Sequence, residues 1–458
     1  MIEIEGVEVL GAEAQTHLAG PKAQRNSICA SMLLETSDDV DPAEFVRRIK
    51  ARISSAIDLV PRLRKVAIQL PGNENFRVLA DPPALDLDAH IQVNALDEVV
   101  SEERFRELVL MFNDQPLDLD RPLWRLMVVP HIEGGLTGIA IRVHHFVQDG
   151  VLGAASAAIL LIDDSPDREL REAPPYEPAP LPTVEQLEQL AKEVAHEHRH
   201  EVASLVEGAS GHPSRTVQHL RGIAATYRDE LKEKPSDLLS RRSDMRGLDL
   251  VQVPIEQIKR CQESLGEHVS FNDVAVTAFA GGMSRMLDPE QRAGEELRVD
   301  VPISLSLHDK DKGFDSSASF MVLALPLDED DPHETLRLVN TQSRERKGEE
   351  AESIERLMHA LMMLPLKTFE RASAAAWSSG NLLFSDIPGP QMEMYVGGHR
   401  LRTLLGVGNL RGASALRVVA ASFGDQVSFG IVYDSSTIPI ERLKAGILET
   451  LELLERPC

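Results

Sequence analysis

The sequence predicts a mixed α/β (α+β) protein of two lobes joined by a helical crossover. Its 458 residues exceed one typical domain, and 43% of them are hydrophobic, which is enough for two cores. Strand-like and helix-like patterns alternate on both sides of a stretch that is first Pro-rich and acidic and then heavily charged. We expect an N-terminal lobe at 1–165, a crossover at 166–245 and a C-terminal lobe at 246–458.

Composition excludes several classes of protein. Lys and Arg total 48 against 73 Asp and Glu, a net charge of −25, and only 4% of residues are aromatic, so no nucleic-acid partner is expected. Cys29, Cys261 and Cys458 lie far apart and form neither a disulfide framework nor a zinc ribbon. The acidic N-terminus lacks signal-peptide features, and the apolar run 151–162 is too short to span a bilayer. We therefore expect a cytoplasmic protein that is soluble or peripheral to a membrane.

An amphipathic helix is predicted to start at Asp41 and to end before Pro61. Asp is a good N-cap, Pro42 suits the first turn, and apolar residues follow at four-residue spacing from Phe45. Residues 41–66 carry seven basic residues against three acids, which makes them a basic island in an acidic chain. A solvated helix face is the simpler interpretation, and contact with phosphates or a membrane surface is the alternative.

The remaining strands and helices are predicted from the strand-like and helix-like patterns of the sequence. Runs rich in β-branched residues predict strands at 136–144, 250–254, 297–305, 320–327, 381–390, 416–424 and 427–434. Helical patterns are found at 154–162, 183–235, 271–287, 333–346 and 349–363. The connection at 163–180 reads as an exposed loop.

The strongest candidate for chemistry is His144-His145 followed by Asp149-Gly150, placed between a strand and a buried helix. Successive strand residues point to opposite faces, so one imidazole at most faces a given cavity, and the pair is ill suited to chelate a metal from one side. One working imidazole, with Asp149 in the next turn and Gly150 easing the helix entry, is the functional interpretation. A packed histidine pair with Asp149 as a helix N-cap explains the spacing equally well.

A second match, His196-Glu197-x-x-His200, has the spacing of a zinc peptidase helix. It lies in a highly charged helix without an apolar strip or a third ligand, so we set it aside as the metal alternative. The chain contains no phosphate-binding or dinucleotide-binding glycine motif and no G-x-S-x-G elbow.

The histidine motif resembles that of the bacterial wax ester synthase/diacylglycerol acyltransferase (WS/DGAT) family, within the chloramphenicol acetyltransferase-like superfamily. Further segments agree in the same order along the chain: Pro122-Leu123-Trp124, Asn272-Asp273, VPISLS at 301–306, SDIPGP at 385–390 and VSFGIVYD at 427–434. Some positions depart from the family pattern, namely the degraded signature near residues 9–21, Ser306 for an Arg, Asp386 for an Asn, and Asp315-Ser316-Ser317 for a Gly-Asn pair.

The resemblance implies two chloramphenicol acetyltransferase-like lobes with an active-site tunnel between them. It implies transfer of a long-chain acyl group from acyl-CoA to a hydroxyl acceptor, either diacylglycerol or a fatty alcohol. His145 would be the general base, with His144 and Asp149 supporting it, while Gly150, the PLW residues and the Asn-Asp pair support the motif. Trp124 is expected to be a packing residue.

Acyl-CoA would be a co-substrate, with no permanently bound cofactor and no metal; the resemblance assigns no residues to its binding. The expected partners are acyl-CoA, a lipid or alcohol acceptor, and a membrane or lipid-droplet surface, on the inner face of the membrane. Two alternatives stay open. One is a related acyltransferase of specialised metabolism with another alcohol or an amine as acceptor. The other is a non-catalytic acyl-CoA- or lipid-binding homologue, which Ser306 and Asp386 motivate.

Overall fold

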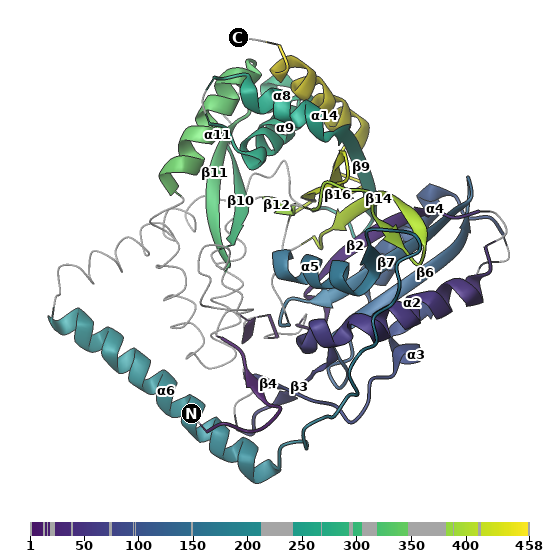
Figure 1. Cartoon of the computed structure of the whole chain (residues 1–458). Helices are drawn as coiled ribbons and strands as arrows, with labels where there is room; N and C mark the ends of the chain where they lie inside the picture. The colour runs from purple at the N-terminus through teal and green to yellow at the C-terminus, as the bar shows by residue number, and fades with distance from the viewer. Residues whose placement is uncertain are drawn as a thin grey trace.

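Figure 1 shows a computed structural model of the chain, drawn in cartoon form. It describes residues 2–11, 14–15, 17–18, 23–37, 40–72, 76–94, 96, 98–147, 150–211, 241–266, 268–292, 296–304, 318–346, 382–387, 389–410 and 414–456. Within these residues, two large sheets with their helices form two lobes. The predicted mixed α/β fold of two lobes is confirmed.

The N-terminal lobe contains a seven-stranded sheet in the order β5-β6-β7-β2-β14-β13-β8. Its strands are β2 (Ser27–Glu35), β5 (Ile91–Val93), β6 (Trp124–Ile132), β7 (Leu136–His144), β8 (Ile162–Asp163), β13 (Tyr395–Val396) and β14 (His399–Val407). β7 pairs antiparallel with β2 and β6, and every one of its residues is buried. The strand that ends at His144 is therefore at the centre of the lobe.

Helices bury both faces of this sheet. α2 (Pro42–Ala56) and α5 (Gly150–Leu161) cover one face, and α4 (Glu102–Asp114) covers the other. α2 begins as predicted, because Asp41 Oδ1 accepts a 2.9 Å hydrogen bond from the Ala43 amide. The remaining helical segments of the lobe are short: η1 (Ala23–Arg25), η2 (Ile57–Leu59), η3 (Pro61–Arg64) and α3 (Leu87–His90).

The C-terminal lobe contains a six-stranded sheet in the order β11-β10-β12-β15-β16-β9. Its strands are β9 (Arg246–Pro254), β10 (Glu296–Ser304), β11 (Ala318–Pro326), β12 (Leu382–Ile387), β15 (Leu416–Phe423) and β16 (Gln426–Asp434). Figure 1 shows the main helices gathered at the top of the lobe: α8 (Ile255–Glu263), α9 (Phe271–Met286), α11 (Pro332–Arg346) and α14 (Ile440–Leu454), with α10 (Pro289–Arg292) beside them in sequence. α9 and α14 pack closely at Gly281, where a larger residue would not fit: a Cβ at this position would lie 1.8 Å from Thr450 Oγ1.

The C-terminal segment donates two strands to the N-terminal sheet. β13 and β14 follow the C-terminal lobe's β12 in sequence, yet they belong to the N-terminal sheet, where β14 pairs antiparallel with β2. One hydrophobic cluster also unites the lobes and combines residues of both sheets and of α4: Cys29, Leu33, Phe105, Val109, Leu248, Leu405, Val407 and Val432. The lobes therefore share a sheet and a core.

The crossover starts as a tethered segment and continues as a long helix. Arg171 Nε donates to the Ser55 carbonyl at 2.6 Å and its guanidinium pairs with Asp58, while Tyr176 Oη donates to the Pro82 carbonyl at 2.9 Å. Much of the segment 163–180 is exposed, as predicted, but Asp163 at its start is buried and the segment is fastened to the N-terminal lobe.

The crossover helix α6 (Val184–Gly211) buries Leu187, Leu190 and Val194 against a small sheet of β1 (Glu8–Val9), β4 (Arg77–Ala80) and β3 (Val66–Gln69). The rest of the predicted helical region 183–235 and the predicted helix 349–363 lie outside the described residues.

The basic island at 41–66 divides into two groups. Arg47 and Arg48 are exposed and pair with Glu44 on their own helix. Arg52 pairs instead with Asp163 at 2.8 Å, and Arg62 and Lys65 pair with carboxylates of the same lobe. The solvated-face interpretation holds for the outer group, and the inner group neutralises acids within the fold.

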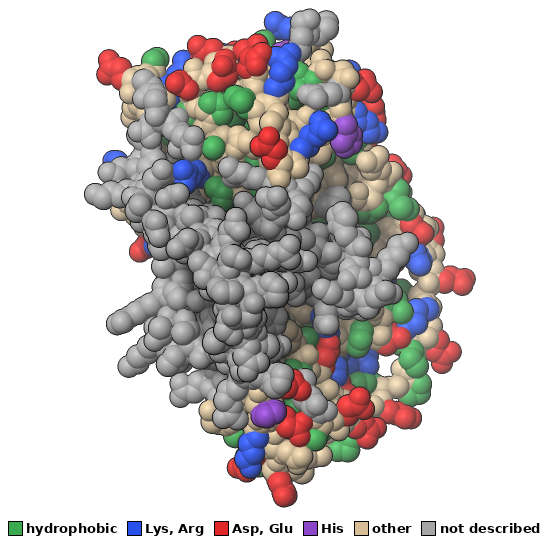
Figure 2. Space-filling view, turned by 90° about the vertical axis from the view of Figure 1, so that its left-hand side faces the viewer, with side chains coloured by type: hydrophobic (Ala, Val, Ile, Leu, Met, Phe, Trp, Pro, Cys, Tyr) green, Lys and Arg blue, Asp and Glu red, His purple; other side chains and the backbone are tan. Residues whose placement is uncertain are grey.

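Surface charge is mixed on the face that Figure 2 shows. Asp and Glu side chains at its upper and lower ends are interspersed with Lys and Arg, and the described residues drawn there form no continuous basic patch. Across the described part of the chain, no helix has both the length and the apolar character needed to cross a bilayer.

Candidate active site

His144 is the last residue of β7 and is completely buried. Its amide donates to the Leu123 carbonyl at 2.9 Å, and its Nδ1 accepts a 2.9 Å hydrogen bond from the Phe146 amide. Because an accepting ring nitrogen carries no proton, His144 is a neutral imidazole protonated on Nε2. Its hydrogen bonds fix the turn that follows the strand.

His145 lies in different surroundings, as the alternation of strand residues predicts. It is only partly buried, its amide donates to the Asn26 carbonyl at 3.0 Å, and its Nε2 atom is enclosed. The ring stacks on that of His17, with 4.9 Å between centroids and 23° between planes. Of the two residues, His145 is therefore the more exposed to solvent.

The PLW residues support the histidine motif from the neighbouring strand. Leu123 supplies the carbonyl that receives the His144 amide, and Pro122 is buried beside it. Trp124 is fully buried; its Nε1 donates to the Leu63 carbonyl at 2.8 Å and its ring stacks on His90 at 4.4 Å. The expectation that Trp124 is a packing residue agrees with this geometry.

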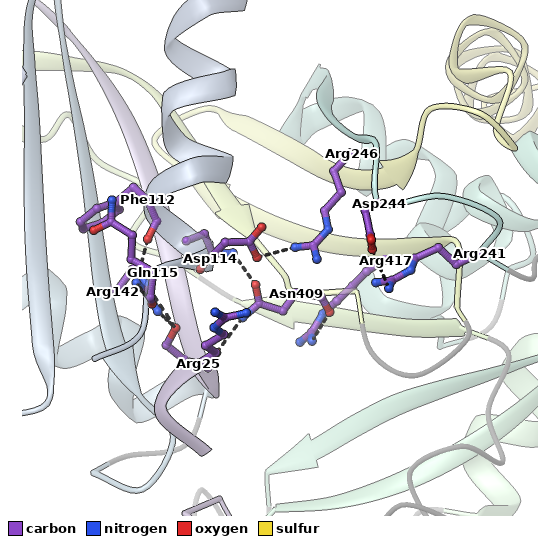
Figure 3. A network of polar contacts seen from close by, with 12 residues as sticks. Arg25, Phe112, Asp114, Gln115, Arg142, Arg241, Asp244, Arg246, Asn409 and Arg417 are labelled. Atoms are coloured by element: carbon purple, nitrogen blue, oxygen red, sulfur yellow. Dashed lines mark hydrogen bonds and ion pairs between the residues drawn. The ribbon is translucent and has the colours of Figure 1, made fainter. Parts of the chain in front are cut away.

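A buried arginine, which the sequence analysis did not single out, lies two residues before His144. Arg142 is 1% exposed, and Figure 3 shows its guanidinium directed at the end of α4. One of its nitrogens donates to the carbonyls of Phe112 and Gln115, each at 2.7 Å, and the others contact Ser27 Oγ. Burial lowers the pKa of Arg142 to about 10, so the group remains charged at neutral pH.

The end of α4 also connects the two lobes, as Figure 3 shows. Asp114 pairs with Arg246 of β9, and Asn113 Nδ2 donates to Asn409 Oδ1 at 2.8 Å. Asn409 Nδ2 in turn donates to the Arg25 carbonyl at 3.0 Å, one residue before Asn26. The loop after β14 is thereby connected to the segment that contains Asn26, whose carbonyl accepts the hydrogen bond of the His145 amide.

The Asn-Asp pair of the C-terminal lobe lies at the start of α9. Asp273 forms a capping box with Ser270: its Oδ2 accepts from the Ser270 amide at 2.9 Å, and its own amide donates to Ser270 Oγ at 3.2 Å. Asn272 precedes it with its Oδ1 buried. The pair therefore belongs to the second lobe, and for Asp273 the contacts are those of a helix cap.

Asp386 lies on β12, which packs against α5, the helix that follows the histidine motif. The side chain is half-buried, its Oδ1 is enclosed, and burial raises the pKa of Asp386 to about 7. The Gly389 amide donates to Ser422 Oγ at 3.0 Å and holds the following turn against β15.

Some predicted residues cannot be placed. Gly150 begins α5, whereas Asp149 and Ser306 lie outside the described residues, so neither the cap nor the ion pair of Asp149 is visible. In the part of the chain that the structure describes, no three His, Cys, Asp or Glu side chains gather in a way that could hold a metal ion. His196 lies on α6, and the side chain of His200 is not among the described ones.

Comparison with protein families decides the relationship. The model of the wax ester synthase/diacylglycerol acyltransferase catalytic domain matches residues 12–275, and that of the WS/DGAT C-terminal domain matches residues 317–455. The chain belongs to the WS/DGAT family. The resemblance inferred from the motifs is confirmed, and so is the expectation that the protein is an acyltransferase.

Relatives from this family match nearly the whole chain. A putative diacylglycerol O-acyltransferase of Mycobacterium tuberculosis is 24% identical over 454 residues, which cover 96% of this chain and 93% of the relative. Another from the same organism is 25% identical over 462 residues, covering 94% and 87%.

Solved structures show the shared fold. The wax ester synthase/diacylglycerol acyltransferase from Marinobacter aquaeolei VT8 superposes with a TM-score of 0.65 at 18% identity, covering 98% of each chain. A starter condensation domain of the rhizomide synthetase, in complex with C8-CoA, gives 0.55 at 14% identity and covers 98% and 94%. The WS/DGAT chain described here therefore shares its two-lobed fold with both enzymes.

Three site residues of this WS/DGAT chain were missed by sequence reasoning. Arg142 gave a signal, since a charged residue inside the apolar strand 136–144 needs buried partners. His17 and Asn26 gave none, because both lie in or near the degraded N-terminal signature and only the fold brings them to His145.

Proposed function

We propose that this WS/DGAT chain transfers a long-chain acyl group from acyl-CoA to a hydroxyl acceptor, making triacylglycerol from diacylglycerol, wax ester from a fatty alcohol, or both. The observation that carries the proposal is the position of His145: it directly follows the central strand, with its ring supported on one face and only partly buried. Family membership and the acyl-CoA bound in a structural neighbour support the choice of donor.

In the proposed reaction, neutral His145 takes the proton of the acceptor hydroxyl as its oxygen attacks the thioester carbonyl. The new C–O bond forms a tetrahedral intermediate, the C–S bond then breaks, and the imidazolium returns the proton to the CoA thiolate. The products are an ester and free CoA, and the histidine regains its starting state without an acyl-enzyme.

The neighbouring residues support this base. Fully buried His144 holds the turn through its contacts with Leu123 and Phe146, and we assign Asp149 the role of anchoring the next turn. We propose that no metal takes part, because Nδ1 of His144 is occupied by a backbone amide and the two rings have different surroundings. Full activity after exhaustive chelation is the expected result; loss that added zinc restores would overturn this point.

We further propose a tunnel between the lobes that leads both substrates to His145, and division of the chain at 1–165, 166–245 and 246–458. The donated strands β13 and β14 qualify this division, because they join the first lobe's sheet from within the third segment. Since the acceptor is water-insoluble, we place the enzyme in the cytoplasm, at a membrane or lipid-droplet surface.

Turnover tests the proposal. Purified enzyme is given palmitoyl-CoA with dioleoylglycerol, hexadecanol, another alcohol, an amine or no acceptor, and both free CoA and the acylated product are measured. Acceptor-dependent ester formation is expected, and His145→Ala is expected to lower it about 10²–10⁴-fold while leaving the fold intact.

Other outcomes identify the alternatives. CoA release without an acceptor indicates a thioesterase, and transfer to the other alcohol or the amine alone indicates a specialised acyltransferase. Binding of palmitoyl-CoA without any product, in the wild type as in His145→Ala, indicates the non-catalytic homologue.

A further inference from the structure

We propose that His17 is a positioning residue for His145, holding its imidazole in the orientation from which it takes the acceptor's proton. This inference rests on the function proposed for His145. The two rings stack with centroids 4.9 Å apart and planes inclined by 23°. The residues lie far apart in sequence, and the histidine motif itself does not contain position 17.

The backbone alone does not fix the plane of the His145 ring. The torsion that turns an imidazole about its Cβ–Cγ bond has a broad, roughly two-fold preference, so a catalytic histidine needs a neighbour to select one orientation. A flat ring stacked on one face of the imidazole restricts that rotation.

His17 is itself held firmly through Gln15. The Gln15 side chain is completely buried; its Oε1 accepts from the Arg77 amide at 2.9 Å, and its Nε2 donates to the carbonyls of Arg77 at 2.8 Å and Leu10 at 3.1 Å. The His17 amide then donates to the Ala14 carbonyl at 3.1 Å. A single amide side chain thus fixes this short turn against β4.

Asn26 aligns the two histidines with each other. Its Nδ2 donates to His17 Nδ1 at 2.7 Å, and its carbonyl accepts from the His145 amide at 3.0 Å. Since an amide nitrogen can only donate, His17 Nδ1 accepts, and a singly protonated His17 carries its proton on Nε2. A neutral ring face beside His145 also favours the positive charge that His145 acquires when it takes the proton.

The proposed positioning depends on the stacked ring of His17 and not on its nitrogens. A phenylalanine ring should therefore be able to take over the role of His17. We expect His17→Ala to lower kcat about 10-fold while the KM for palmitoyl-CoA stays unchanged, because the role proposed for His17 is to orient the base and not to bind the donor. We expect His17→Phe to return kcat to within about threefold of wild type.

The matched control is His399→Ala. The His399 ring packs against Phe45 at a centroid distance of 5.6 Å, and its strand position is at the end of β14 remote from the histidine motif. This variant loses the same side chain and one ring contact, and kcat should not change. Thermal melts on all variants separate misfolding from misorientation.

A spectroscopic measurement makes the test independent of turnover. In protein with ¹³C,¹⁵N-labelled histidine, the ring resonances of His145, assigned by their loss in His145→Ala, should shift in His17→Ala and shift less in His17→Phe.

Wild-type kcat in His17→Ala overturns the inference, and so does an equally slow His17→Phe that melts normally. If His145→Ala itself retains full turnover, the proposed role of His145 as the base fails instead. Unchanged His145 resonances in His17→Ala would still decide against the stack.

Discussion

The guanidinium of Arg142 donates a 2.7 Å hydrogen bond to the carbonyl oxygen of Phe112, which joins the central strand to the end of α4. The last carbonyls of a helix have no partner within the helix and carry its negative partial charge, so a buried cation is well placed there. The strand continues for two residues to His144. One side chain therefore links the helix end to the strand that carries the histidine motif.

We expect Arg142→Met to destabilise the fold and slow turnover together. Methionine retains much of the apolar stem but removes the donor to the Gln115 carbonyl and leaves the Phe112 carbonyl with the Gln115 amide alone. A buried acceptor left unsatisfied costs ~1–3 kcal/mol. Urea unfolding measures the free energy, and the acyl-transfer assay measures kcat. Arg47→Met is the control, since its ion pair with Glu44 is exposed to solvent and contributes little to stability. Equal losses in the two variants would contradict the role of Arg142.

Asp434 should make stability sensitive to acid. Its side chain accepts hydrogen bonds from the Arg242 and Ser243 amides and from the hydroxyls of Ser243 and Ser436, all at 2.7–2.8 Å. Burial opposes ionisation of Asp434, but the hydrogen bonds from Ser436 and Ser243 outweigh it and hold its pKa well below the usual range.

The corresponding variant is Asp434→Asn. A depressed carboxyl pKa contributes stability above the unfolded value of ~3.9, and this contribution is lost as the pH falls toward the folded value. We expect a loss of ~1.5–3 kcal/mol at pH 7 that shrinks below pH 4. The control is Asp425→Asn, at an exposed turn of the same sheet. A loss that is independent of pH would contradict the ionised form of Asp434.

Asp386 should have the opposite pH dependence. Burial raises its pKa to about 7, so the folded state favours the protonated form; the resulting stability is complete below about pH 4 and is lost as the pH rises through 7. Asp386→Asn removes this loss. At pH 8 the variant should be more stable than wild type, by ~1.4 kcal/mol for each tenfold decrease that folding causes in the acid dissociation constant of Asp386. At pH 4 the two proteins should have nearly equal stability. Melting curves at both pH values, with Asp425→Asn as reference, test this; a variant less stable at pH 8 would refute it.

Cutting the crossover should not separate the lobes. A specific protease site inserted after the exposed Glu172 allows one cut within 163–180. Because β13 and β14 lie in the N-terminal sheet and one hydrophobic cluster spans both lobes, the cut protein should elute from gel filtration as one species. Asp58→Ala, which removes the ion partner of Arg171, should speed the cut. Two separate folded fragments would contradict the sheet and the hydrophobic cluster that the lobes share.

Features set by local sequence were predictable. Asp41 caps its helix as expected, 136–144 is a strand, and the start of α9 carries the Asn-Asp pair, because each depends on neighbours within a few residues. The same holds for His144 and His145: alternation along a strand is enough to separate their surroundings.

Features set by distant partners were not predictable. Nothing in the sequence around 395–407 indicates that this segment pairs with β2 rather than with its own lobe, since both sheets offer buried neighbours. The His17 ring needs Gln15, Asn26 and Arg77 to reach His145, and these contacts exist only in the folded chain. Likewise, the exposed loop expected at 163–180 is tethered by Arg171, whose partners lie in α2 and η2.

The donated strands β13 and β14 also determine when the protein can finish folding during its synthesis. β2 is made early, but Arg400, which lies beside Glu35 in the finished sheet, follows it by 365 residues. At roughly 5–20 residues per second, the ribosome needs about 20–70 s to supply that neighbour. Throughout this interval one edge of β2 has unsatisfied backbone groups, which can pair with another nascent chain. Yield in cells should therefore depend on chaperones that bind the chain before β14 emerges.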